Sequence, residues 1–281
     1  MSTIIDMRNR PAFLHDFFGA SPGTAAYETA VWLNHRVGSL DVGHLERSST
    51  LSGYLSELEQ AGVDKAVVVG RETPDLTIDN DQISALVSQS SRLVGIGSVD
   101  IQTRGADSAI SEIHRAVREL GFKAINIEPG FGLPAHHADD PLLDPVYQTC
   151  LELGVPVCLM TGPTTPDFDF AHPNAVARLA RRYSDLKIIC YHGYYPFVNE
   201  ILGAAFRYQN IYLVPDMYIF QPGAQLYVEA ANGFLQDQLL FGSSYPFRAL
   251  SQTIKDYRSL GFKSTVLDNI FFKNAQAILN I

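Results

Sequence analysis

Short apolar runs alternate with amphipathic stretches along almost the whole chain, and this alternation limits the fold more than any other feature. The apolar runs are rich in Val and Ile, which is typical of parallel strands covered on both faces. They predict strands at residues 4–7, 66–69, 93–99, 124–128, 155–160, 187–192, 211–215 and 239–242. The amphipathic stretches predict helices at residues 50–61, 79–90, 105–120, 143–153, 173–183, 196–207, 224–232 and 250–260.

Eight strand–helix units in 281 residues predict an α/β fold, the (β/α)8 TIM barrel, as a single domain over residues 1–281. A doubly wound open sheet is the alternative, but no Gly-rich turn follows the first strand. Residues 9 to about 47 form a long insertion after that strand, and helical turns follow from Ser264 to the end. Such insertions at a barrel mouth are usually lids or contact surfaces. This one holds the aromatic residues Phe13, Phe17, Phe18, Tyr27 and Trp32.

Charge and hydropathy exclude several classes of partner. The net charge of −9 argues against nucleic acid, because binding phosphates needs a basic face. No run of about 18 apolar residues predicts a membrane span. No basic and apolar leader is evident at the start, so we expect a cytoplasmic protein. The spacing of Cys150, Cys158 and Cys190 suggests no zinc clip, and we expect the last two to be buried in strands.

Several predicted strand ends carry sequences that resemble one family, the amidohydrolase-2 group of the amidohydrolase superfamily. The first strand continues into Asp6-Met7-Arg8-Asn9-Arg10, which is similar to an opening Asp-x-His-x-His motif with arginine at both histidine positions. Residues 239–247, Leu-Leu-Phe-Gly-Ser-Ser-Tyr-Pro-Phe, resemble a closing Gly-Ser-Asp-Tyr-Pro motif, with Ser244 at the aspartate. Further similar segments lie at 121–130, 154–162, 184–193 and 269–275. The group includes aminocarboxymuconate decarboxylases, aromatic-acid decarboxylases and lactone hydrolases.

The resemblance implies a metal site whose usual ligands this chain mostly lacks. The five family positions hold Arg8, Arg10, Met160, His192 and Ser244, and of these only His192 is the family's residue type. Arginine has no lone pair to offer and would repel a cation. We therefore expect no metal cofactor. The alternative is a displaced divalent site, such as zinc, built from Glu128, Asp100 or Asp216.

Two readings of the arginines stay open. Arg8 and Arg10 are two residues apart at a strand end, so we expect both to point to the same side. In the structural reading they pair with Glu128, Asp6 or Asp216 and fill the vacated metal space. In the functional reading they clamp a carboxylate, sulfonate or phosphate of a substrate.

Other candidates follow predicted strands as well. His192 is expected to act as a general base or as a donor to a developing oxyanion. Ser244 and Glu128 are the other catalytic candidates. Ser244 is expected to hydrogen-bond the substrate or to act as a nucleophile. Glu128 is expected to act as an acid or base, or to serve as a counterion of the arginines. We expect the substrate pocket to include Arg71, Met160, Tyr191 and Asp216 besides the two arginines.

These residues predict a hydrolase that acts without a tightly bound metal on a small anionic organic acid, for example on a lactone or ester. One alternative is a decarboxylase or hydratase on the same barrel, and another is a catalytically inactive barrel that binds a metabolite. A homo-oligomer paired through residues 9–47 is a further expectation.

Overall fold

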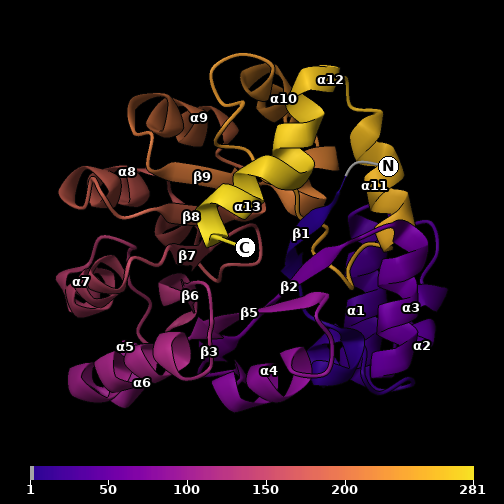
Figure 1. The fold of residues 1–281 in the computed structure, drawn as a ribbon, viewed down its shortest axis with the longest axis horizontal. Coiled ribbons are helices and arrows are strands. Elements are labelled where there is room, and N and C mark those ends of the chain that lie inside the picture. Colours follow the sequence, from indigo (N-terminus) through magenta and orange to yellow (C-terminus); the bar gives the residue numbers. More distant parts are fainter. Residues whose placement is uncertain (1–2) are drawn as a thin grey trace.

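The computed structural model describes residues 3–281, in which parallel strands curve into a barrel surrounded by helices (Figure 1). The seven-stranded sheet has the order β1-β2-β5-β6-β7-β8-β9, so each strand pairs with its neighbour along the chain. These strands are β1 (Ile5–Asn9), β2 (Lys65–Val69), β5 (Leu93–Ser98), β6 (Ile125–Ile127), β7 (Val157–Met160), β8 (Ile188–Tyr191) and β9 (Ile211–Val214). The predicted TIM-barrel architecture is confirmed.

The predicted eighth strand is wrong in detail, because residues 239–245 make only isolated bridges, from Leu239 to Leu213 and from Tyr245 to Asn9, and form no regular strand. The segment still closes the barrel between β9 and β1. Leu240 N donates to Leu213 O at 2.9 Å on one side, and Met7 N donates to Phe241 O at 3.0 Å on the other. The backbone then turns at Ser244, whose φ of 59° is incompatible with a strand.

The predicted helices are all present with slightly shorter bounds. Polar caps fix some of their starts: Thr50 accepts from Gly53 N, and Asp79 forms a capping box with Gln82. The helices around the barrel are α3 (Leu51–Ala61), α4 (Asn80–Val87), α6 (Ala106–Arg118), α7 (Asp144–Leu153), α8 (Asn174–Arg182), α9 (Val198–Arg207), α10 (Gln225–Ala231) and α11 (Leu250–Arg258). No helix within residues 3–281 is long and apolar enough to cross a membrane.

Alternating side chains of the strands build an inner and an outer core. In β2, Val67 and Val69 join the inner cluster, whereas Ala66 and Val68 face the helices. The chain's last helices, α12 (Ser264–Asp268), the π-helix η8 (Asn269–Lys273) and α13 (Asn274–Leu279), follow α11. Helix α13 lies across one end of the barrel (Figure 1), where Ile278 and Leu279 pack on the inner cluster. Cys158 and Cys190 are buried free thiols, as expected.

Other elements lie at the opposite end of the barrel or between its units. The insertion contains α1 (Ala25–Arg36), α2 (Gly43–Arg47) and the 3-10 turns η1 (Ala12–Leu14) and η2 (Asp16–Phe18). A hairpin of β3 (Arg71–Thr73) and β4 (Leu76–Ile78) and a short helix α5 (Ile101–Arg104) were not predicted. Further 3-10 turns are η3 (Pro129–Phe131), η4 (Pro141–Leu143), η5 (Phe168–Ala171), η6 (His192–Tyr194) and η7 (Asp216–Phe220).

Buried polar contacts fasten the insertion to the barrel. The ring of His44 lies between two carbonyls, with Nδ1 2.8 Å from Asp41 O and Nε2 2.7 Å from Pro246 O. The guanidinium of Arg248 donates to Val37 O at 2.7 Å. The insertion is therefore attached to the same segment that closes the barrel.

Asp6 ties the first strand to the closing segment. Its buried carboxylate accepts from Ser243 N at 2.8 Å and from Arg8 N at 3.1 Å. Burial raises the pKa of Asp6 to about 6, although the hydrogen bonds from Ser243 oppose this rise. The folded protein therefore holds a proton on Asp6 more tightly than the unfolded chain does. Its free energy of unfolding falls by roughly 3 kcal/mol as pH rises from about 4 to above 6.

We predict that Asp6→Asn stabilises the protein above pH 7 by about 1–2 kcal/mol and has little effect near pH 4. The asparagine oxygen still accepts both backbone hydrogen bonds, but no buried charge has to form. Urea unfolding of both proteins at pH 4.5 and pH 8 measures the difference. Equal destabilisation at both pH values would contradict this account of Asp6.

Candidate active site

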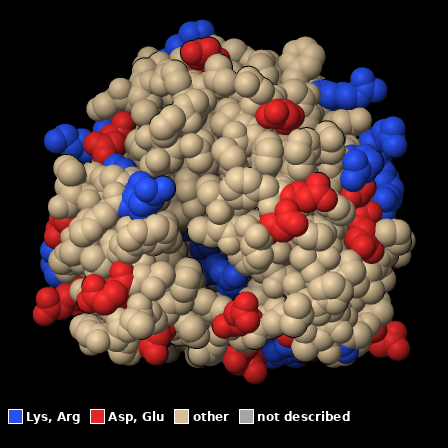
Figure 2. All heavy atoms as spheres, turned by 180° about the vertical axis from the view of Figure 1, so that it is seen from behind, with Lys and Arg blue, Asp and Glu red and all other residues tan. Residues whose placement is uncertain are grey.

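A cavity of about 480 Å³ opens at the carboxyl ends of the strands. Figure 2, which views the molecule from behind Figure 1, shows a hollow with basic side chains on its floor. The barrel contributes residues that follow five of its strands, and the hairpin contributes more. The insertion covers one side with aromatic groups. The sequence candidates that line this cavity together are Arg8, Arg10, Arg71, Met160 and His192.

A bulge in β1 brings Arg8 into the cavity. Asp6 pairs with Ala66 and Asn9 pairs with Val68, so β1 holds one residue more than β2 over this stretch. The Asp6 carboxylate fixes the bulge by accepting the Arg8 backbone N–H. A Cβ on Gly242 would stand 3.2 Å from Arg8 Cβ and 2.5 Å from a Val214 methyl. The absence of a side chain at Gly242 therefore provides the space that the Arg8 side chain fills.

The guanidinium of Arg8 is buried without a counterion among the described residues. Arg8 is 3% exposed, and no carboxylate oxygen of residues 3–281 lies within 4.0 Å of it. The guanidinium instead donates to the uncharged Met160 Sδ at 3.8 Å and lies 5.4 Å from the centre of the Tyr191 ring. Its Nε has no hydrogen-bond partner within the described chain. Burial lowers the pKa of Arg8, while the charges of Asp216 and Glu128 raise it. A buried cation left in this state favours binding of an anion.

Arg10, in contrast, has a counterion and backbone acceptors within the protein. Its guanidinium donates to Val69 O at 2.9 Å, Gly70 O at 3.1 Å and Glu128 Oε1 at 2.8 Å. Of the two expected arginine pairs, the structure therefore forms the one at Arg10 and not the one at Arg8. Burial and the charge of Arg8 lower the pKa of Arg10 to about 9, which leaves it charged at neutral pH.

Glu128 lies behind the cavity wall as a counterion. Burial alone would raise its pKa, but the charges of Arg71 and Arg10 outweigh burial and hold the pKa at about 2. Arg71 Nε lies 3.2 Å from Glu128 Oε2, and Asn126 donates to Oε1 at 3.1 Å. Glu128 therefore stays ionised across the physiological range, which suits a structural ion pair better than proton transfer.

His192 and Asp216 form a buried pair at the ends of β8 and β9. His192 Nδ1 lies 2.9 Å from Asp216 Oδ1, and the His192 backbone N–H donates to Oδ2 at 3.3 Å. Both residues have left-handed backbones, with φ of 57° and 42°. Such conformations cost about 1–3 kcal/mol each and cluster at functional sites. Because Asp216 occupies Nδ1, Nε2 is the ring nitrogen left for a ligand.

The remaining candidates lie beside the cavity. Tyr191 packs behind Arg8, and Asp216 lies behind His192, so neither lines the cavity directly. Ser244 is 1% exposed, its Oγ has no partner among the described residues, and it is not one of the lining residues. Its catalytic role stays a prediction.

Sequence reasoning missed part of the wall. Phe131 in η3 and Met217 in η7 line the cavity, as do Phe247 and the hairpin residues Asp75 and Leu76. Phe131 and Met217 could have been found in the sequence from their position, because η3 and η7 directly follow predicted strands. From the insertion, the aromatic residues that line the cavity are Phe17, Phe18 and Trp32.

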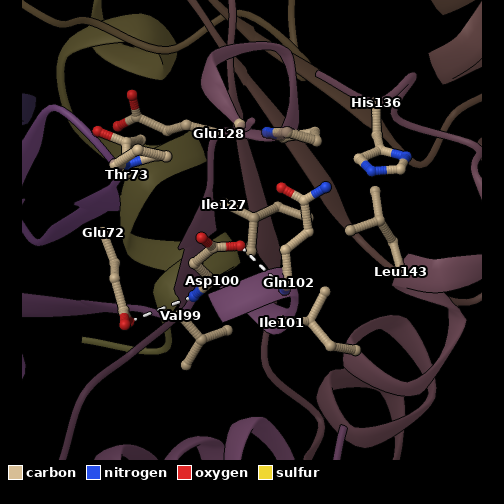
Figure 3. Close-up of a pocket in the computed structure, with 13 residues that line it drawn as sticks. Glu72, Thr73, Val99, Asp100, Ile101, Gln102, Ile127, Glu128, His136 and Leu143 are labelled. Atoms are coloured by element: carbon tan, nitrogen blue, oxygen red, sulfur yellow. Dashed lines mark hydrogen bonds between the residues drawn. The ribbon is translucent and has the colours of Figure 1, made fainter. Parts of the chain in front are cut away.

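A second, water-sized cavity of about 20 Å³ lies between the hairpin and α5 (Figure 3). Glu72 and Asp100 line this cavity, and their carboxylates accept hydrogen bonds from neighbouring residues. Glu72 pairs with Arg104 at 2.8 Å, and Asp100 caps α5 by accepting from Gln102 N at 3.0 Å. Asp100, Glu128 and Asp216 therefore do not assemble the displaced metal site considered from the sequence.

Comparison with known proteins identifies a family and several related proteins. A family model described as amidohydrolase matches residues 43–281. An uncharacterised TIM-barrel protein of Bordetella bronchiseptica is 30% identical with a TM-score of 0.91, over 99% of this chain and 98% of that one. A 79-residue segment, 28% of this chain, is 37% identical to the 2-amino-3-carboxymuconate-6-semialdehyde decarboxylase of Dictyostelium discoideum. The match spans only 21% of that decarboxylase.

A more distant structure carries a metal. The dihydroxybenzoic acid decarboxylase of a Polaromonas species, solved with manganese and the inhibitor 2-nitroresorcinol, is 17% identical with a TM-score of 0.70. The alignment covers 100% of this chain and 97% of that one, and at this identity it shows the fold alone.

The donor set of the present cavity does not fit a divalent cation. Manganese prefers oxygen and imidazole ligands, several at once. Within residues 3–281, no group of three or more His, Cys, Asp or Glu side chains could hold a metal ion. His192 and Asp216 bond to each other, and the Arg8 guanidinium lines the same cavity as His192.

We predict that the purified, never-chelated protein contains less than about a tenth of an equivalent of zinc or manganese, because Arg8 repels a cation at this position. Inductively coupled plasma mass spectrometry before and after dialysis against manganese measures the content. Retention of a full equivalent after gel filtration would show that a site exists.

We also predict that Glu128→Gln destabilises the protein by about 3–5 kcal/mol at pH 7, because two buried arginines lose their counterion. The ionised carboxylate stabilises the fold above its unfolded pKa of about 4.5, and this contribution is lost as pH falls toward about 2. The deficit measured by urea unfolding should therefore shrink in acid. The exposed Glu119→Gln is the matched control, for which we expect a change within about 0.5 kcal/mol.

Proposed function

Because this chain belongs to the amidohydrolase family, we propose that it is a decarboxylase acting on a small aromatic carboxylic acid. The proposal rests on one observation above all. The buried guanidinium of Arg8 has no counterion among residues 3–281 and lies in a cavity shared with His192. The decarboxylases among the compared proteins support this reaction over hydrolysis.

Arg8 supplies the anchor for the carboxylate. A guanidinium presents parallel N–H groups that match a carboxylate, and the pairing is stronger away from water. The Met160 thioether and the Tyr191 ring contact this cation, and neither brings a negative charge to it. The aromatic wall of Phe17, Phe131 and Phe247 suits a flat, apolar ring attached to that carboxylate.

His192 supplies the proton that replaces the lost group. Its imidazolium donates a proton from Nε2 to the ring carbon that bears the carboxylate. The bond between that carbon and the carboxylate then breaks, its electron pair returns to the ring, and neutral CO2 leaves. Asp216 accepts the Nδ1–H throughout and stabilises the positive charge before transfer. Solvent returns a proton to His192, so one proton is consumed for each CO2 released.

Hydrolysis of a lactone or ester is a second candidate, favoured by the same His192–Asp216 pair. Neutral His192 could take a proton from water through Nε2, and Arg8 could stabilise the oxyanion formed on the carbonyl. This reaction consumes one water and releases no CO2, so product analysis separates it from decarboxylation.

We predict that His192→Asn lowers CO2 release from hydroxybenzoic acids by about 10²–10⁴-fold while carboxylate binding stays within a few-fold, because Arg8 is untouched. Arg8→Met should instead lose binding, because the anchor is gone. Headspace CO2 and isothermal titration calorimetry with the wild-type protein and both variants measure the two effects.

Turnover without CO2, with ¹⁸O from labelled water in the product, would contradict decarboxylation and support hydrolysis. Ligand binding without turnover of any acid or lactone in the panel would instead support a barrel that only binds a metabolite.

A further inference from the structure

The three arginines that line the cavity differ in how many donors they have left. Arg10 uses Nε and one terminal nitrogen on two carbonyls and Glu128, which leaves only its other terminal nitrogen without a polar contact in the described chain. Arg8 has a buried Nε without a partner in the described chain and a single weak contact through a terminal nitrogen. The Arg71 side chain makes its polar contacts with described residues through Nε, to Thr73 Oγ1 and Glu128 Oε2, both at 3.2 Å. Arg8 and Arg71 therefore each have terminal N–H groups to offer a ligand.

Arg71 is held in place like a binding residue. It begins β3, directly after the end of β2, so the rigid barrel and not a loose loop fixes its backbone. Its guanidinium lies 4.8 Å from the centre of the Phe131 ring, which supports its flat face. Its side chain is 12% exposed, and both Arg71 and Phe131 line the cavity.

The hydrogen bonding of Glu128 does not require Arg71. Glu128 Oε1 already accepts from Arg10 and Asn126, while Oε2 makes an ion pair with Arg71 that lacks hydrogen-bond geometry. Arg71 thus contributes its positive charge to the ion pair with Glu128, and its two terminal nitrogens make no hydrogen bond with the described residues.

The charged groups of the protein around the cavity are not balanced, because positive groups outnumber negative ones. Arg8, Arg10, Arg71 and, in the form that donates a proton, His192 are positive. Glu128 and Asp216 are the carboxylates paired with them, and the buried Asp6, which accepts the Arg8 backbone N–H, adds a third negative charge once pH exceeds its pKa of about 6. The site that donates a proton therefore has an excess of two positive charges while Asp6 is protonated and of one when Asp6 is ionised. Asp16 and Asp75 also line the cavity but are exposed, where solvent screens their charge.

We infer that the substrate is a dianion, and that Arg71 is the specificity-determining residue that binds its second acidic group. The inference rests on the proposed function: the carboxylate bound by Arg8 beside His192 is the one that leaves, and the group bound by Arg71 remains in the product. A cavity of about 480 Å³ is within the usual range for a ligand of this size.

Calorimetric titration of the full-length protein with benzoate, benzene-1,3-dicarboxylate and benzene-1,4-dicarboxylate at constant ionic strength tests this inference. We expect at least one diacid to bind about 10- to 100-fold more tightly than benzoate, as one additional charge-assisted pair provides. Arg71→Met should remove most of this ratio, because it removes the second anchor. Arg71→Lys keeps the charge beside Glu128 but loses the fork, so it should keep only part of the ratio.

Arg118→Met is the matched control, since it deletes an exposed arginine on α6 that lies away from the cavity. It should leave the ratio unchanged. Equal affinity of the wild-type protein for benzoate and both diacids would overturn the inference. An equal loss of monoacid and diacid binding in both Arg71 variants would also overturn it, because that is the result of a structural role.

The same samples separate this inference from the function on which it rests. CO2 release from a monoacid with no diacid preference would overturn the second anion site and leave the decarboxylase standing. A diacid preference without CO2 release would overturn the decarboxylase and leave the second anion site standing.

Discussion

The positive charge of three neighbouring arginines governs how the residues at the barrel mouth are arranged. Burying a guanidinium costs several kcal/mol unless an anion and hydrogen-bond acceptors compensate it. Glu128 and two backbone carbonyls satisfy Arg10, and the charge of Glu128 also compensates Arg71. Among the residues that the structure describes, nothing comparable satisfies Arg8, which contacts a thioether and an aromatic ring. The fold thus retains one buried cation that no anion of the described residues compensates by direct contact.

The closure of the barrel and the placement of Arg8 depend on the same few atoms. Asp6 accepts backbone N–H groups from Arg8 and Ser243, so one carboxylate fixes the bulge in β1 and the segment that completes the barrel. Gly242 in that segment leaves the space that Arg8 fills. The insertion is attached to the same segment through His44 and Pro246. Its aromatic side chains are thereby fixed beside the cavity, where they can exclude water from an ion pair formed at Arg8.

Much of the frame could be predicted from the sequence, since apolar periodicity reports directly on strands and helices that must be buried. Seven strands and the surrounding helices were predicted with small errors at their ends. The strand predicted in the closing segment was wrong in detail. Its apolar residues 239–241 are typical of a strand, but Gly242 and the left-handed backbone of Ser244 follow directly. The hairpin after β2 was missed because Arg71 and Glu72 read as a polar loop.

Sequence also selected most of the candidate site, because residues directly after parallel strands meet at one end of a barrel. It could not decide how the charges there would pair. Arg8 and Arg10 are two residues apart and of the same type, yet one is neutralised by Glu128, 118 residues further along the chain, and the other is not. That difference arises from a one-residue bulge and from side chains on distant strands. The sequence by itself thus determined a barrel with arginines at its mouth, and only the tertiary structure decided which of them stays free, because ion pairing depends on distances of a few ångströms that no local pattern encodes.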